Sequence, residues 1–152
     1  MERLTTTPEE TELLGQELAA RLRGGDIVLL RGDLAAGKTT LVRGLVCGLS
    51  GDGEEVTSPT FVLVQTYPCA GRGIGLVHHI DLYRLARSSP HALREVGIEE
   101  LLSESDAVAA IEWPRAEIVG WVPRDARLWE VLIEALDDDR RRITVTAPEG
   151  EG

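Results

Sequence analysis

Disulfide frameworks, zinc clusters and membrane spans all have sequence requirements that this chain of 152 residues does not meet. The chain has two cysteines, Cys47 and Cys69, which are too few for a disulfide framework and lack the spacing of a metal site. Cys47 lies within the apolar stretch LVCGL, so a buried, unreactive thiol is expected there. No apolar run approaches the roughly 18 residues of a membrane-spanning helix, and the first residues form no basic-plus-apolar leader. We therefore expect a soluble, cytoplasmic protein.

Basic residues are scarce relative to acidic ones, and the formal net charge is −10. Contacts to nucleic-acid phosphates need clustered lysine and arginine, so an acidic chain is a poor general binder of RNA or DNA. Aromatic residues make up only 4% of the chain, but the composition is otherwise that of an ordinary globular protein. The length predicts a single domain over residues 1–152, with a disordered tail at about residues 148–152.

The spacing of apolar residues predicts helices that alternate with strands. Thr7, Pro8 and Glu10 are the candidate N-cap, first residue and capping-box acid of a helix that reaches about Arg23. Further helices are expected at 39–49 and 90–102. Strands are expected at 27–31, 61–67, 74–81, 107–113, 127–136 and 141–147, the last two joined as a hairpin. This order predicts an α/β fold whose sheet is part parallel and part antiparallel.

Lysine is nearly absent, because Lys38 is the only one in the chain. It lies in GDLAAGKT, residues 32–39, which fits the phosphate-binding pattern G-x-x-x-x-G-K-[ST] between an apolar strand and a helix. In such a loop, backbone N–H groups surround the phosphates and the helix directs its positive end at them. Lys38 is predicted to reach the β- and γ-phosphates as a compact charge that a planar arginine would not replace well. The hydroxyl of Thr39 is predicted to ligate Mg²⁺.

The metal side of such a site needs an acidic residue at the end of a neighbouring apolar strand. Two residues compete for this place, Asp81 after GLVHHI and Glu112 after AVAAI. Glu112 follows the purer apolar run and is our candidate, which leaves Asp81 as a switch-loop acid or a water-positioning residue. Spacing alone decides neither assignment, and a strand-end acid that merely faces water is the alternative for both.

Asparagine is absent altogether, so the N-K-x-D motif that reads guanine cannot be present, and ATP is favoured over GTP. His78 and His79 alternate along an expected strand and should face opposite sides, one packed and the other exposed. The run DDDRRR at 137–142 is most simply a solvated turn, although its arginines could touch a nucleotide or a partner.

Four motifs, taken in their order, resemble one family. They are GDLAAGKT at 32–39, SPTF at 58–61, DLYRL at 81–85 and IEWP at 111–114. With this set the chain resembles, over nearly its whole length, the TsaE (YjeE-type) ATPases of bacterial tRNA threonylcarbamoyladenosine (t6A) synthesis. The resemblance implies a P-loop NTPase-like mixed β-sheet flanked by helices, with C-terminal antiparallel strands.

The same resemblance implies residue roles. Lys38, Asp81 and Glu112 would be catalytic, and Thr39 with Glu112 would hold Mg²⁺. Switch segments would contain Ser58, Pro59, Thr60, Asp81 and Trp113. The ATP phosphates would be bound by Gly32, Asp33, Leu34, Ala35, Ala36, Gly37, Lys38, Thr39 and Thr40. Ala35 stands where the family usually has glycine, and a positive φ there would add strain of roughly 1–2 kcal/mol.

Proteins of this family act with TsaD and TsaB, which transfer threonylcarbamoyl to adenosine 37 of tRNAs that read codons beginning with A. The resemblance implies an ATP-driven step that supports this complex without performing the transfer, so tRNA is reached only through the complex. A small-molecule kinase is the alternative, for which residues 83–94 could serve as a lid. A nucleotide-binding regulator without meaningful turnover is a third possibility.

Overall fold

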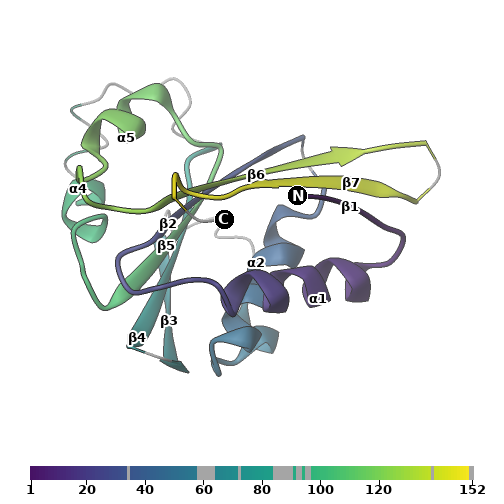
Figure 1. Cartoon of the computed structure of the whole chain (residues 1–152), viewed down its shortest axis with the longest axis horizontal. Helices are drawn as coiled ribbons and strands as arrows, with labels where there is room; N and C mark the ends of the chain where they lie inside the picture. The colour runs from purple at the N-terminus through teal and green to yellow at the C-terminus, as the bar shows by residue number, and fades with distance from the viewer. Residues whose placement is uncertain are drawn as a thin grey trace.

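The computed structural model describes residues 1–33, 35–57, 64–71, 73–83, 91, 94, 97–137 and 139–150. In this part of the chain, seven strands form one sheet in the order β1–β7–β6–β2–β5–β4–β3 (Figure 1). The strands are β1 (Glu2–Thr5), β2 (Ile27–Gly32), β3 (Val64–Gly71), β4 (Ile74–Asp81), β5 (Ala107–Glu112), β6 (Leu128–Ala135) and β7 (Arg141–Thr146). The helices are α1 (Pro8–Ala19), α2 (Lys38–Gly48), α4 (Ile98–Leu101) and α5 (Ala116–Trp121), with a 3₁₀ turn at Gly53–Glu55.

The central strand β2 leads directly into the glycine-rich loop. It is parallel to β5 on one side and to β6 on the other, and β4 is parallel to β5. The carboxyl ends of β2, β4 and β5 therefore meet at one edge of the sheet, where ligands of open α/β folds bind. The outer pairs β3–β4, β6–β7 and β1–β7 are antiparallel. The predicted α/β fold, a mixed sheet with C-terminal antiparallel strands, is confirmed.

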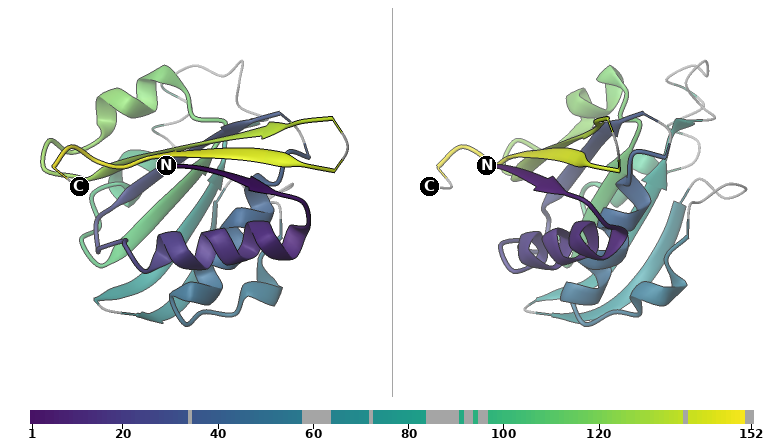
Figure 2. Two further views of the ribbon diagram at one scale, coloured as in Figure 1. Left: turned by 45° about the vertical axis from the view of Figure 1, so that its right-hand side comes forward. Right: turned by 90° about the vertical axis from the view of Figure 1, so that its right-hand side faces the viewer.

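Helices cover both faces of the sheet, α1 and α2 on one side and α4 and α5 on the other (Figure 2). The residues of β2 alternate between two hydrophobic cores. Val28 and Leu30 pack with residues of α1 and α2, whereas Ile27 and Leu29 pack with residues of α4 and α5. A strand covered on both faces has no polar side, which explains why the sequence shows a continuous apolar run there.

Helices α1 and α2 approach closely because each contributes a glycine to their contact. A Cβ atom on Gly44 would lie 1.9 Å from the carbonyl oxygen of Glu12, and one on Gly15 would lie 2.3 Å from that of Leu41. Neither position tolerates a larger residue without a shift of the backbone. The glycine inside α2 therefore serves helix packing in spite of its low helix propensity, and this packing places the start of α2 beside α1.

The first helix begins as predicted but ends earlier. The Thr7 side chain accepts a hydrogen bond from the Glu10 backbone N–H at 3.1 Å, and Pro8 is the first helical residue. The helix ends at Ala19 instead of near Arg23, where the side chain of Asp26 accepts a hydrogen bond from the Arg23 N–H at 2.9 Å. The Asp26 N–H donates in return to the Arg23 carbonyl oxygen at 3.0 Å, so a closed turn precedes β2.

Other expectations need correction or fall partly outside the described residues. Cys47 is exposed, not buried, because it points outward from α2 while its neighbour Val46 points into the core. The expected strand at 61–67 is described only from Val64, and the expected helix at 90–102 is described as α4 with isolated residues before it. Of the expected C-terminal tail, residues 151 and 152 lie outside the described residues.

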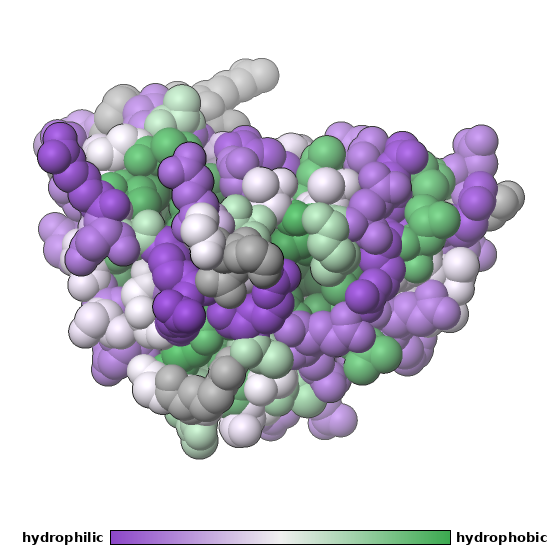
Figure 3. All heavy atoms as spheres, in the orientation of Figure 1, coloured by the Kyte–Doolittle hydropathy of each residue, from purple (hydrophilic) through white to green (hydrophobic). Residues whose placement is uncertain are grey.

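One face of the molecule carries hydrophobic residues scattered among hydrophilic ones. On the face of Figure 1, hydrophobic residues form separate groups between hydrophilic ones (Figure 3). The large hydrophobic side chains that are exposed include Leu4, Val119 and Leu132. None of the helices in the described segments combines the length and the apolar character that crossing a bilayer requires.

Candidate functional site

The loop between β2 and α2 has the backbone of an anion cradle. Gly37 precedes α2 with φ of 115°, and no side chain of the described residues caps this end of the helix. The N–H groups of the first turn are therefore open to an anionic ligand, toward which the helix directs its positive end. Ala35 has φ of 59°, so the positive φ considered for this position is present. An alanine in this region is strained by roughly 1–2 kcal/mol relative to ordinary backbone.

Lys38 is the first residue of α2, and its side chain folds back over the loop. Its ammonium donates hydrogen bonds to the carbonyl oxygens of Gly32 at 2.5 Å and Asp33 at 3.2 Å. Burial lowers the pKa of Lys38, an effect opposed by the negative charges of Glu112, Asp81 and Asp33. The only lysine of the chain thus provides a partly desolvated positive charge at the mouth of the cradle.

Glu112 joins the end of β5 to the start of α2. Its Oε2 accepts a hydrogen bond from the Thr39 hydroxyl at 2.9 Å and another from His79 Nε2 at 2.5 Å. Only 3% of Glu112 is exposed, so its carboxylate is held almost entirely by protein groups. Of the two acids that competed in the sequence, Glu112 is the one that contacts the threonine of the loop.

Asp81 lies opposite Glu112 in the parallel register of β4 and β5. Its Oδ1 accepts a hydrogen bond from the backbone N–H of Tyr83 at 2.9 Å. Burial raises the pKa of Asp81, and the charge of Glu112 acts in the same direction, against the Tyr83 hydrogen bond and the nearby His79 and Lys38. Asp81 therefore belongs to the same charged cluster but does not share Glu112's bond to the loop.

Trp113 lies against the charged cluster and contacts both Lys38 and Tyr83. Its indole ring lies with its centre 3.7 Å from the Lys38 ammonium and 4.9 Å from the centre of the Tyr83 ring. The backbone of Trp113 has φ of 57°, which is unusual for a bulky residue and is typically found where function requires it. Trp113 therefore contacts the lysine of the loop.

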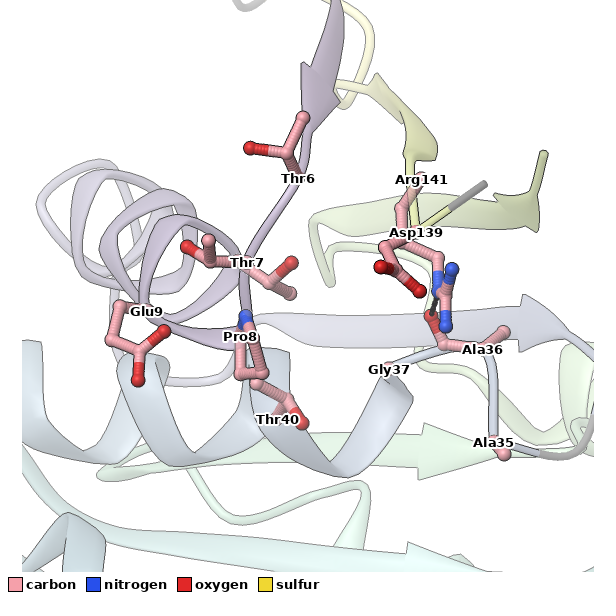
Figure 4. A pocket seen from close by; sticks show the side chains of 11 residues that line it. Thr6, Thr7, Pro8, Glu9, Ala35, Ala36, Gly37, Thr40, Asp139 and Arg141 are labelled. Carbon is pink, nitrogen blue, oxygen red and sulfur yellow. Dashed lines mark hydrogen bonds between the residues drawn. The ribbon is translucent and has the colours of Figure 1, made fainter. Parts of the chain in front are cut away.

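A cavity of about 380 Å³ opens beside the second half of the loop (Figure 4). It lies between the start of α1, the start of α2 and the β6–β7 turn, with Thr7, Thr40 and Asp139 among its lining residues. Arg141 reaches across from β7, and its Nε donates a hydrogen bond to the carbonyl oxygen of Ala36 at 3.0 Å (Figure 4). The run DDDRRR is therefore more than a solvated turn, because one of its arginines contacts the loop. The volume is within the range of small-molecule sites.

The oxygen atoms of Thr39 and Glu112 suit a cation whose other ligands come from a bound phosphate. Among the described residues, no group of three or more His, Cys, Asp or Glu side chains has the arrangement of a metal site. Thr39 and Glu112 place two oxygen atoms next to each other at the end of the cradle. Mg²⁺ is commonly bound by one or two protein oxygens together with water and substrate phosphates, so the pair fits a nucleotide-bound Mg²⁺.

The expectation that one of the two neighbouring histidines is exposed is wrong, and four of the expected site residues lie outside the described part of the chain. Both His78 and His79 are buried, at 3% and 0% exposure, although they do face opposite sides. His78 is satisfied on its own side by Thr66 and Glu104, which is why it need not reach water. The positions that lie outside the described residues are Leu34, Ser58, Pro59 and Thr60.

Comparison with known proteins identifies the family. The family model for "Threonylcarbamoyl adenosine biosynthesis protein TsaE" matches residues 5–143. This chain belongs to the TsaE family. It is 41% identical over 137 residues to the TsaE protein of Rickettsia conorii, covering 90% of this chain and 73% of that one. It is 40% identical over 134 residues to TsaE of Streptomyces coelicolor, covering 88% and 87%.

A solved structure supports the same assignment. The crystal structure of Bacillus subtilis YdiB matches this fold with a TM-score of 0.68 and 29% sequence identity, over 97% of this chain and 85% of that one. TsaE from Bacillus subtilis is 36% identical over 143 residues. Membership of the TsaE family supports a role in t6A biosynthesis on tRNA.

Proposed function

We propose that this TsaE family member binds and hydrolyses ATP with Mg²⁺ and in this way supports t6A modification of tRNA. The observation that carries the proposal is the meeting of a phosphate-type cradle with the Thr39–Glu112 pair at its end. A buried positive charge, an open helix N-terminus and cation-binding oxygens within one small region are what phosphoryl transfer from a nucleotide requires.

The residues of the cradle take separate roles in this proposal. The backbone from Gly32 to Thr40 binds the phosphates, and Lys38 leaves the carbonyls of its own loop to meet the β- and γ-phosphate oxygens. Thr39 and Glu112 hold the Mg²⁺, which neutralises the charge that develops on the phosphates. Asp81, which stands at the end of the neighbouring strand, orients the attacking water or forms part of a switch, together with Ser58 to Thr60 and Trp113.

The cavity beside the loop is the place for the nucleoside. Thr40 lies at the border between the cradle and this cavity, so a nucleotide whose phosphates fill the cradle would extend its ribose and base toward Asp139 and Arg141. Arg141 holds the Ala36 carbonyl and lines the cavity, which ties the C-terminal hairpin to the nucleotide. ATP is the favoured nucleotide, because the chain contains no asparagine for the guanine-reading motif.

The partners in this proposal are TsaD and TsaB, with tRNA contacted only through their complex. The net charge of −10 favours a protein partner over a direct nucleic-acid partner. P-loop proteins often gain a charge-stabilising arginine from a partner, which can raise turnover by about 10³–10⁵-fold. We therefore expect slow hydrolysis by the protein alone and a changed rate within the complex.

The test is Mg²⁺-dependent ATP hydrolysis by the pure protein, first alone and then with TsaD and TsaB. Slow hydrolysis that changes when the pair is added supports a partner-coupled ATPase. An absence of both ATP binding and hydrolysis would refute the proposal. Phosphate transfer to an added small molecule, without any effect of TsaD and TsaB, would identify a kinase instead.

A further inference from the structure

His79 is fully buried on β4, behind the mouth of the cradle. Its Nε2 lies 2.5 Å from Glu112 Oε2, the same oxygen that accepts the Thr39 hydroxyl at 2.9 Å. One carboxylate oxygen thus has two donors, which come from two different elements of the fold. Two donors at fixed positions define the rotation of the carboxylate, and with it the place of its other oxygen.

The state of the second ring nitrogen, Nδ1, indicates that His79 has more than a structural role. His79 Nδ1 is buried and finds no hydrogen-bond partner within the described segments of the chain. A carboxylate only accepts, so the tautomer with hydrogen on Nε2 and a bare Nδ1 satisfies Glu112. A buried polar atom without a partner destabilises a fold, and an apolar side chain would fill the same space at less cost. The position retains a donor aimed at Glu112 instead.

The register of the sheet explains how the contact forms. His79 lies opposite Ala110 of β5, two residues before the Asp81–Glu112 pair. Because Ala110 has a small side chain, the imidazole can extend along β5 to the carboxylate. Val77, two residues earlier on the same face of β4, packs into the core beneath α1 and α2, so the strand that carries His79 is held in place there.

We propose that His79 is a positioning residue for the metal-side carboxylate: it holds Glu112 so that Glu112 and Thr39 present their oxygens ready for a nucleotide-bound Mg²⁺. The inference rests on the proposed function, because it assigns Glu112 to the metal side. Carboxylate ligands of metal ions are commonly fixed by hydrogen-bond partners of their own, and loss of such a partner weakens metal affinity by about 10–100-fold.

The test compares His79→Asn with His79→Gln. Glutamine carries an N–H donor that can reach Glu112, whereas asparagine is shorter by one methylene and cannot. Binding of AMP-PNP, a non-hydrolysable ATP analogue, would be measured by calorimetry in EDTA and over a series of Mg²⁺ concentrations. We expect His79→Asn to raise the Mg²⁺ concentration at half-maximal effect by about 10–100-fold. Binding in EDTA should stay unchanged, and His79→Gln should restore most of the Mg²⁺ response.

Two controls separate positioning from damage to the core. His78→Asn alters an equally buried histidine whose partners, Thr66 and Glu104, lie on the other face, so its Mg²⁺ dependence should match the wild type. His79→Asn added to Glu112→Gln should produce no further loss, because a residue that acts through Glu112 has nothing left to position. If His79→Asn does not fold, His79→Phe, which keeps a ring and lacks the donor, takes its place.

Failure of the positioning role of His79 and failure of the proposed ATP binding give different results. A wild-type Mg²⁺ dependence in His79→Asn, or the same shift in His78→Asn, would overturn the positioning role while leaving the proposed function intact. Wild-type protein that does not bind AMP-PNP at all would overturn the proposed function, and the positioning role with it.

Discussion

The Lys38 ammonium lies 3.7 Å from the centre of the Trp113 ring, and both residues are at the mouth of the cradle. A partly desolvated cation over an indole face is stabilised by up to about 2 kcal/mol. The same ammonium donates to the carbonyl oxygens of Gly32 and Asp33. Lys38 is therefore bound by its own protein in this structure, and a phosphate must compete with the ring and the two carbonyls for it.

Nucleotide binding should consequently change the fluorescence of Trp113, because it draws the ammonium away from the ring. We expect ADP titrated into the wild-type protein to change tryptophan emission, and Trp113→Phe to abolish that change. Trp121→Phe removes the tryptophan of α5 and is the control, because the emission change should persist in this variant. An unaltered emission change in Trp113→Phe would show that the ring does not report on Lys38.

Replacement of Lys38 tests the cradle itself. Lys38→Ala should weaken ADP binding by at least about 10-fold, the loss expected when a charged hydrogen-bond donor is removed from a phosphate. Lys38→Arg should also weaken it, since a planar guanidinium does not occupy the place of a compact ammonium. Calorimetric titration measures both.

Arg31→Ala is the matched control for Lys38, because it removes a positive charge from the exposed Arg31–Glu130 pair on the surface of the sheet. Its ADP affinity should equal that of the wild type. Unchanged affinity in Lys38→Ala would rule out the cradle as the phosphate site.

The contiguous part of the site could be predicted from the sequence. The glycines, Lys38 and Thr39 form one short motif between a strand and a helix, so local spacing was sufficient. The preference for Glu112 over Asp81 as the acid beside the loop agrees with the Thr39–Glu112 hydrogen bond. That preference used the purer apolar run before Glu112, which is also a local property.

Contacts between distant elements could not be predicted, because they depend on strand order and register. His79 reaches Glu112 because β4 pairs with β5 in one particular register, and a slip of one residue would turn it to the other face. Arg141 meets Ala36 only because β6, which carries the hairpin, lies beside β2. Strand β1 and helix α5 have four and six residues, too few for a periodic pattern to reveal.

Ala35→Gly should relieve the positive φ of the loop. Removal of the backbone strain at residue 35 should stabilise the fold by about 1–2 kcal/mol. The greater conformational freedom of glycine in the unfolded chain offsets roughly 0.5–1 kcal/mol of this gain. We expect Tm to rise by up to about 4 °C, with ADP affinity equal to or higher than that of the wild type. Ala36→Gly is the control, because Ala36 is buried without a positive φ and its replacement should lower Tm. A lower Tm in Ala35→Gly would mean that the strain is relieved in some other way.

Glu112→Gln and Asp81→Asn should separate the two acids. Glu112→Gln replaces the carboxylate that accepts the Thr39 hydroxyl, so it should raise the Mg²⁺ requirement of AMP-PNP binding by about 10-fold or more. Asp81→Asn should alter this requirement less and reduce ATP hydrolysis more. Mg²⁺ titrations followed by steady-state hydrolysis measure both effects. The reverse order would exchange the roles of the two acids.

Asp81→Asn should also stabilise the nucleotide-free protein at neutral pH. Burial raises the pKa of Asp81, so the folded protein binds this proton more tightly than the unfolded chain does. The stability that Asp81 contributes to the folded protein is therefore largest below the ordinary pKa of an aspartate. It is lost as the pH rises through the raised pKa of Asp81 in the folded protein. Asparagine carries no charge, so Tm of Asp81→Asn should exceed that of the wild type at neutral pH and converge with it in acid. Asp106→Asn, at an exposed carboxylate, is the control and should have a Tm close to that of the wild type at neutral pH. A Tm of Asp81→Asn below that of the wild type at neutral pH would show instead that the Asp81 charge is stabilised by its surroundings.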